Sequence, residues 1–196
     1  MYRINHLMKQ IFLMITIAAL VVSCGKTGMP LPYGYFRVDM PEHAYVPTPD
    51  SLNLPYSFEV SNAAIIRKRT DAAELHWIDV SYPQLHASLY CSYLPVKGNL
   101  FQLMEDAHKY VYKHSVKADG IGEKVFQHPE KKVYGILYDL TGNTASSVQF
   151  VLTDSVHHFF RGALYFDNVP NKDSIAPMSD YIREDIVHMM ETFEWR

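Results

Sequence analysis

The chain has 196 residues, of which 18 are basic and 21 acidic, so its formal net charge at pH 7 is −3. This mildly acidic balance disfavours nucleic-acid binding and provides no basic patch for anionic lipid headgroups. The length suits one domain with a sizeable hydrophobic core.

Residues 1–23 have the pattern of a secretory signal peptide. Arg3 and Lys9 give a basic start, and an apolar run over residues 11–22 is interrupted only by Thr16. The run is shorter than the roughly 20 apolar residues that cross a bilayer. It leads into Val-Val-Ser-Cys at residues 21–24, which resembles a bacterial lipobox, where the cysteine is acylated and becomes the new N-terminus. We therefore predict lipidation at Cys24; the alternatives are an ordinary signal peptide or an N-terminal membrane anchor.

Residues 24–55 are predicted to form a tether that packs partly on the domain. They are rich in proline and have little hydrophobic periodicity, but the aromatic stretch at residues 33–36 is unusual for a free linker. Acidic residues directly after an acylated cysteine resemble a surface-export signal of Bacteroidota lipoproteins, and the first carboxylate of this chain after Cys24 is Asp39. We therefore expect the domain to face the periplasm.

Residues 56–196 indicate a single domain of the α+β class. The expected fold is a mostly antiparallel sheet with two main helices packed on it, at residues 100–114, with Asn99 as N-cap, and 177–192, with Pro177 in the first turn. Cys91 is expected to be a small buried hydrophobe, and with Cys24 acylated it has no cysteine to pair with. The predicted strands cover residues 56–60, 75–82, 85–95, 132–141, 147–153 and 157–166.

The last two of these strands are predicted to form a hairpin with a three-residue loop at residues 154–156. This register places Thr153 opposite His157 and Gln149 opposite Arg161, with the apolar side chains on the other face. The resulting row of polar and aromatic residues contains types that are frequent at binding hot spots. It is either a partner surface or a face covered by a helix or by the N-terminal segment, with Arg161 paired to a carboxylate. The candidate partner surface comprises Gln149, Thr153, Asp154, His157, Phe159, Arg161 and Tyr165.

The same region contains every residue type of a serine triad. Ser146, Ser147 and Ser155 lie near Asp154 and His157 in the sequence, but the Gly-x-Ser-x-Gly turn that exposes a nucleophile is absent. Serine and aspartate beside glycine are more simply turn formers. The sequence contains no phosphate-binding glycine loop, cofactor motif or metal-ligand spacing. We therefore expect no catalytic residues, no cofactor and no metal.

Several segments together resemble the gliding motility lipoprotein family GldD of Bacteroidota. The resemblance extends over nearly all of the chain beyond Cys24. It implies a lipid-anchored envelope protein needed for gliding and for the linked type IX secretion machinery, and it brings no established catalytic residues. The matching segments are residues 34–37, 113–114, 142–143, 145–146, 149–150, 153–155, 161–166, 170–171, 173–174 and 194–195.

Two classes of function follow. The first is a non-enzymatic accessory that acts through protein contacts, with other envelope lipoproteins as expected partners and the inner leaflet of the outer membrane as expected location. The alternative is a periplasmic module that binds cell-wall glycan or peptide, or hydrolyses it. A flat polar and aromatic face favours the first, and a deep cleft lined by Arg161, His157 and Asp154 favours the second.

Overall fold

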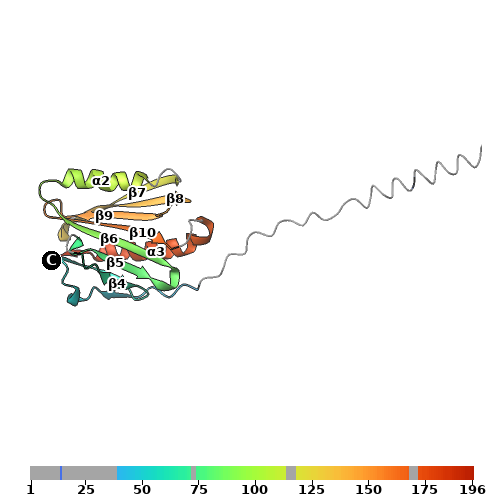
Figure 1. Cartoon of the computed structure of the whole chain (residues 1–196), viewed down its shortest axis with the longest axis horizontal. Helices are drawn as coiled ribbons and strands as arrows, with labels where there is room; N and C mark the ends of the chain where they lie inside the picture. Colours follow the sequence, from blue (N-terminus) through green and yellow to red (C-terminus); the bar gives the residue numbers. More distant parts are fainter. Residues whose placement is uncertain (1–13, 15–38, 72–73, 114–117, 168–171) are drawn as a thin grey trace, which may run out of the picture. The chain divides into compact units, whose positions relative to one another are not determined.

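Seven antiparallel strands form the central sheet of the protein, seen in a computed structural model that describes residues 14, 39–71, 74–113, 118–167 and 172–196 (Figure 1). The strand order is β4-β5-β6-β10-β9-β8-β7. In chain order these strands are β4 (Ile65–Lys68), β5 (Ile78–Tyr82), β6 (Ala87–Pro95), β7 (Ala118–His128), β8 (Val133–Gly142), β9 (Val148–Thr153) and β10 (His158–Phe166).

Two small sheets and two long helices complete the described part of the chain. β1 (Tyr45–Pro47) pairs with β3 (Glu59–Ser61), and β2 (Tyr56–Ser57) pairs with β11 (Glu194–Trp195). The helices are α2 (Leu100–Lys113) and α3 (Lys172–Thr192), and short 3-10 turns lie at Asp50–Leu52, Pro83–Leu85 and Pro129–Lys131. The predicted α+β fold, with a mostly antiparallel sheet and two main helices, is confirmed.

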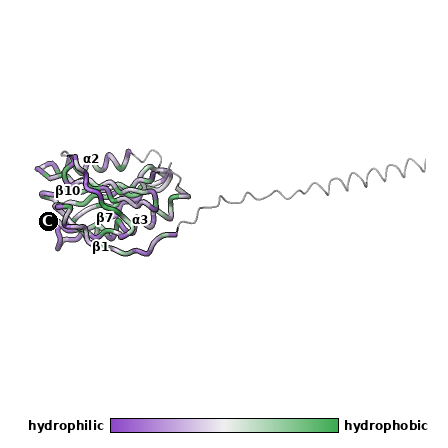
Figure 2. The backbone as a smooth tube through the Cα atoms, turned by 60° about the horizontal axis from the view of Figure 1, so that its bottom comes forward, coloured by the Kyte–Doolittle hydropathy of each residue, from purple (hydrophilic) through white to green (hydrophobic). Residues whose placement is uncertain are grey.

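The helices lie on opposite faces of the sheet because the strands alternate their side chains. On β8, Val133 and Leu137 join the core cluster that contains Ile182 and Ile186 of α3. Tyr138, the next residue after Leu137, belongs instead to the cluster that contains α2. Since successive strand residues point to opposite faces, α3 covers one face and α2 the other. Figure 2 shows the hydrophobic stretches of the backbone gathered in the strands inside the domain.

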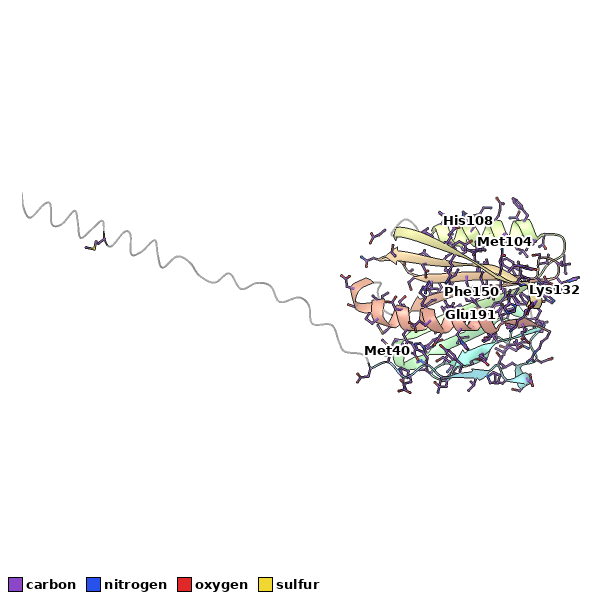
Figure 3. The ribbon with its side chains drawn as sticks, turned by 180° about the vertical axis from the view of Figure 1, so that it is seen from behind. Met40, Met104, His108, Lys132, Phe150 and Glu191 are labelled. Carbon is purple, nitrogen blue, oxygen red and sulfur yellow. The ribbon has the colours of Figure 1, made fainter. Side chains whose placement is uncertain are left out.

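The core is centred on the face that α3 covers. Phe150, Phe160, Leu164 and Phe193 are fully buried there, and Figure 3 shows Phe150 inside the domain, among the strands. Cys91 is a free thiol in the same core, 2% exposed, as its in-phase apolar neighbours predicted. Burial raises the pKa of this thiol, which keeps it in the neutral, unreactive form.

Several element boundaries differ from the sequence-based prediction. The second helix begins at Lys172, so Pro177 lies inside it rather than in its first turn, which costs one backbone hydrogen bond. Asn99 does lie at the predicted N-cap position, where its carbonyl accepts from the Leu103 amide, but its side chain accepts from the Lys97 amide, before α2. The strand predicted over residues 56–60 is divided at Phe58, whose amide donates to the hydroxyl of Thr48 and not to a neighbouring strand.

The register of the β9–β10 hairpin also differs from the prediction. Thr153 pairs with Phe159, Arg161 pairs with Val151, and Ala163 pairs with Gln149. The predicted pairs Thr153–His157 and Gln149–Arg161 are therefore wrong, each by two residues. A two-residue difference keeps every side chain on its predicted face, because the side-chain period of a strand is two.

In the described residues, no helix is both long and apolar enough to cross a membrane. Residues 1–13 and 15–38, which include Cys24, nearly all of the predicted signal peptide and the first part of the predicted tether, lie outside the described part. Within the segment read as tether, β1 pairs with β3 and Leu54 lies in the core.

Candidate functional site

The loop of the β9–β10 hairpin is built around the carboxylate of Asp154. Its Oδ1 accepts hydrogen bonds from the amides of Val156 (3.0 Å), His157 (2.8 Å) and His158 (2.8 Å). Burial by itself would raise the pKa of Asp154, but these amides outweigh it and hold the pKa below its ordinary value. The Thr153 hydroxyl donates to the carbonyl of His158 at 2.6 Å. These bonds explain why the loop is longer than the three residues predicted.

Three residues of the predicted partner surface are buried on the sheet face that carries α2. Gln149 is 3% exposed, Thr153 7% and Phe159 2%, and Phe159 packs in one cluster with Ala107 and Val111 of α2. At these positions the structure agrees with the second alternative, a covered face. The helix α2 covers Phe159 because its apolar stripe needs an apolar partner, which Phe159 and its neighbours supply.

Arg161 lies at the border of the area that α2 covers. Its guanidinium carbon is 4.4 Å from the centre of the Tyr110 ring on α2, a cation–π contact. The described part of the chain offers Arg161 no carboxylate within ion-pair distance, so the predicted carboxylate pairing is not found there. Of the other predicted residues, His157 is largely exposed, 3.6 Å from Asp154, and Tyr165 is half-buried beside Tyr90.

The part of the same sheet face beyond Arg161 has no described helix on it. In Figure 1, α2 lies at the β7–β8 end of the sheet, and β4 lies at the opposite end. Register brings Arg67 opposite Asp79, Asp79 opposite Tyr90, and Tyr90 opposite Ala163. The next row contains Ile65, Ser81, Ser88 and Tyr165. We call this area the open face; it comprises Ile65, Arg67, Arg69, Asp79, Ser81, Ser88, Tyr90, Arg161 and Tyr165.

The charges on the open face are unevenly paired. Arg69 contacts Glu74 (3.0 Å) and Asp79 (3.1 Å), and the bond to Glu74 is the main cause of its raised pKa. Its guanidinium also lies 5.7 Å from the centre of the Tyr90 ring. Arg67 and Arg161, by contrast, have no carboxylate partner among the residues that the structure describes. Two arginines and the 41% exposed Tyr90 are thus available to a ligand.

The three serines considered for a triad make other contacts. Ser146 is fully buried and donates to the carbonyl of Val148. Ser147 hydrogen-bonds Ser179 at 2.7 Å and so links β9 to α3, and the amide of Ser155 donates to Thr153. Among these contacts, none joins a serine hydroxyl to His157 or Asp154.

A second polar cluster was missed because two of its members precede the predicted domain. Asp185, in the middle of α3, has a side chain only 1% exposed. It accepts from Nδ1 of His43 at 2.7 Å and from the hydroxyl of Tyr45 at 3.0 Å. His43 and Tyr45 lie in the proline-rich segment that was read as tether, and no spacing rule connects them to a helix some 140 residues later.

Comparison with known protein families decides the affiliation of the chain. The family model described as "Gliding motility lipoprotein GldD" matches residues 25–195. The chain belongs to this family. GldD membership makes it a lipid-anchored protein of the cell envelope with an accessory role in gliding motility. A comparison with curated proteins gave no match.

Proposed function

We propose that this GldD protein is a non-enzymatic accessory of the gliding and type IX secretion machinery that acts through protein contacts. Lipids on Cys24 hold it in the inner leaflet of the outer membrane, with the domain facing the periplasm. Its partners are other envelope proteins of the machinery.

The observation that carries this proposal is the composition of the open face. Arginine and tyrosine are the residue types that dominate binding hot spots, and here Arg67, Arg161 and Tyr90 lie on one sheet face with side chains open to solvent or half-buried. The serine contacts described above leave the hairpin without a nucleophile joined to a base, so the geometry favours contact over hydrolysis.

The proposal is tested by complementing a deletion strain. The strain receives the wild-type gene or a gene with a photo-crosslinking phenylalanine analogue at Tyr90, and export of a type IX cargo into the medium is measured. Ultraviolet light should then join position 90 to a component of the gliding or secretion machinery. Phe101, which is 78% exposed on α2 outside the open face, is the matched control position. Normal cargo export in the deletion strain would contradict the proposal.

A further inference from the structure

Arg161 is held in a fixed position without being neutralised. The guanidinium carbon lies over the Tyr110 ring, 4.4 Å from its centre, and this contact with the ring does not satisfy the N–H donors along the guanidinium edge. Within the described residues, no hydrogen bond joins this guanidinium to a protein acceptor. The side chain is half-buried, so its donors are partly withdrawn from water. A cation held this way is prepared for an anionic group that approaches along the edge.

The neighbours of Arg161 on this face leave its N–H donors without a carboxylate. Gln149 lies on the adjacent strand, two residue pairs along from the Val151–Arg161 pair, which places the Cα atoms of Gln149 and Arg161 about 7–8 Å apart. Its side chain carries no charge and is 3% exposed, so it borders the open face without belonging to it. On the other side, Arg161 pairs with Ser92, whose side chain is small. Asp79, the carboxylate on the open face, already accepts from Arg69.

A carboxylate has the geometry that this arrangement requires. It accepts two parallel hydrogen bonds from one guanidinium edge, and such charge-assisted pairs are stronger than neutral ones. Further along the face, Arg67 provides a second unpaired cation, and Ile65 (47% exposed) and Tyr90 provide apolar contact area. The spread of these groups over four strands fits an extended segment better than a small ion.

We propose that the open face binds an acidic segment of a partner protein, with Arg161 holding one of its carboxylates. This inference rests on the proposed function, because it names the chemistry of the partner that the accessory contacts. On this proposal, the recognised segment alternates acidic residues with apolar or aromatic ones. The acidic residues would meet the arginines of the open face, and the apolar or aromatic residues would meet its tyrosines.

The test is a titration of the detergent-solubilised full chain, with the arginine side-chain N–H signals followed by NMR. The probes are an eight-residue peptide of alternating Glu and Val, the same peptide with Gln in place of Glu, acetate, and inorganic phosphate. The Glu peptide and acetate should shift the Arg161 Nε–H signal to saturation, and the Gln peptide should not. Arg161→Gln should weaken binding of the Glu peptide about tenfold or more.

Lys124→Gln is the matched control, since it removes one exposed positive charge from β7, outside the open face. It should change the affinity less than about twofold, as expected for a distant, solvent-screened charge. Arg161→Lys keeps the charge but loses the forked geometry, and should bind the Glu peptide more weakly than wild type while melting at the same temperature.

Three results would overturn the inference. They are equal weakening by Arg161→Gln and Lys124→Gln, saturation by phosphate but not by acetate, and self-association of the chain through this face in sedimentation. None of them concerns cargo export, so the proposed function stands or falls separately in the complementation assay.

Discussion

At the residue scale, the pairing of β9 with β10 depends on the absence of a side chain at Gly162. It lies directly opposite Phe150 on the core face, and the Phe150 ring occupies the space where a Cβ at position 162 would be. Gly162→Ala should therefore lower the free energy of unfolding by about 1–3 kcal/mol, the usual cost of overpacking. Gly122→Ala is the control, because its added Cβ meets Asp139 at an ordinary 3.8 Å; it should change stability by less than about 0.5 kcal/mol. Thermal melting of the two variants distinguishes them, and equal losses would contradict this account.

Asp154 gives a second prediction at this scale, on pH. Its folded-state pKa is lowered, so its contribution to stability is present above the pKa of the unfolded chain, about 4, and is lost as the pH falls through the lower folded value. The difference in unfolding free energy between wild type and Asp154→Asn should therefore shrink as the pH is taken from 6 towards 3. Asp50, whose side chain is 88% exposed, serves as the control through Asp50→Asn. A difference that is constant over this range would contradict the role of the carboxylate.

At the scale of elements, the segment before the domain is attached to α3 through Asp185. Besides the bonds from His43 and Tyr45, two ring pairs stack here. The ring centres of His43 and Tyr181 are 4.2 Å apart, and those of Tyr45 and His188 are 3.6 Å apart. Burial and the neighbouring Asp185 raise the pKa of Tyr45, so its hydroxyl remains a donor. This attachment lies between the proposed lipid site and the body of the domain.

Asp185→Ala should release this segment. Two buried hydrogen bonds to a carboxylate are lost, which corresponds to about 1–3 kcal/mol or more of unfolding free energy. The amides of β1 should exchange with solvent faster, and protease should cut near residues 43–47 sooner. Glu184→Gln is the matched control: Glu184 contacts the same His43 at 3.0 Å, but its side chain is 68% exposed, so the loss should stay below about 1 kcal/mol. If both variants exchange alike, Asp185 is not what holds the segment.

The sequence predicted the buried elements better than the exposed ones. β5, β6, β8, β9 and β10 were found because hydrophobic side chains alternate along them. β7 was missed because it is an edge strand that is largely exposed and contains Gly120, Gly122 and charged residues; such features protect an edge from pairing with other chains. β4 forms the other edge of the sheet and was not predicted either. Likewise, the faces of the β9–β10 hairpin followed from alternation, whereas its register depended on hydrogen bonds to Asp154 that no pattern reveals.

At the scale of the whole molecule, the anchor limits where the domain acts. Even fully extended, the chain between Cys24 and Asp39 spans at most roughly 50 Å. Cys24→Ala should abolish labelling by a fatty-acid analogue and abolish export of type IX cargo, although the domain, which does not include Cys24, melts at the wild-type temperature. Fractionation should show the variant unprocessed or released from the membrane. Labelling that persists in Cys24→Ala would contradict lipidation at this residue.

The last prediction concerns the proposed location of the domain on the periplasmic side of the outer membrane. Protease added to intact cells should leave the domain undigested and should cut it only after the outer membrane is opened, because the residues that follow Cys24, Gly-Lys-Thr-Gly, lack the acidic signal associated with surface export. The matched variant carries Lys26→Asp and Thr27→Asp, which supply that signal without changing the domain. In this variant, protease should digest the domain in intact cells. Digestion of the wild-type protein in intact cells would place it on the cell surface and exclude partners confined to the periplasm. If neither protein is digested, the acidic residues do not direct export in this chain, while the periplasmic placement is retained.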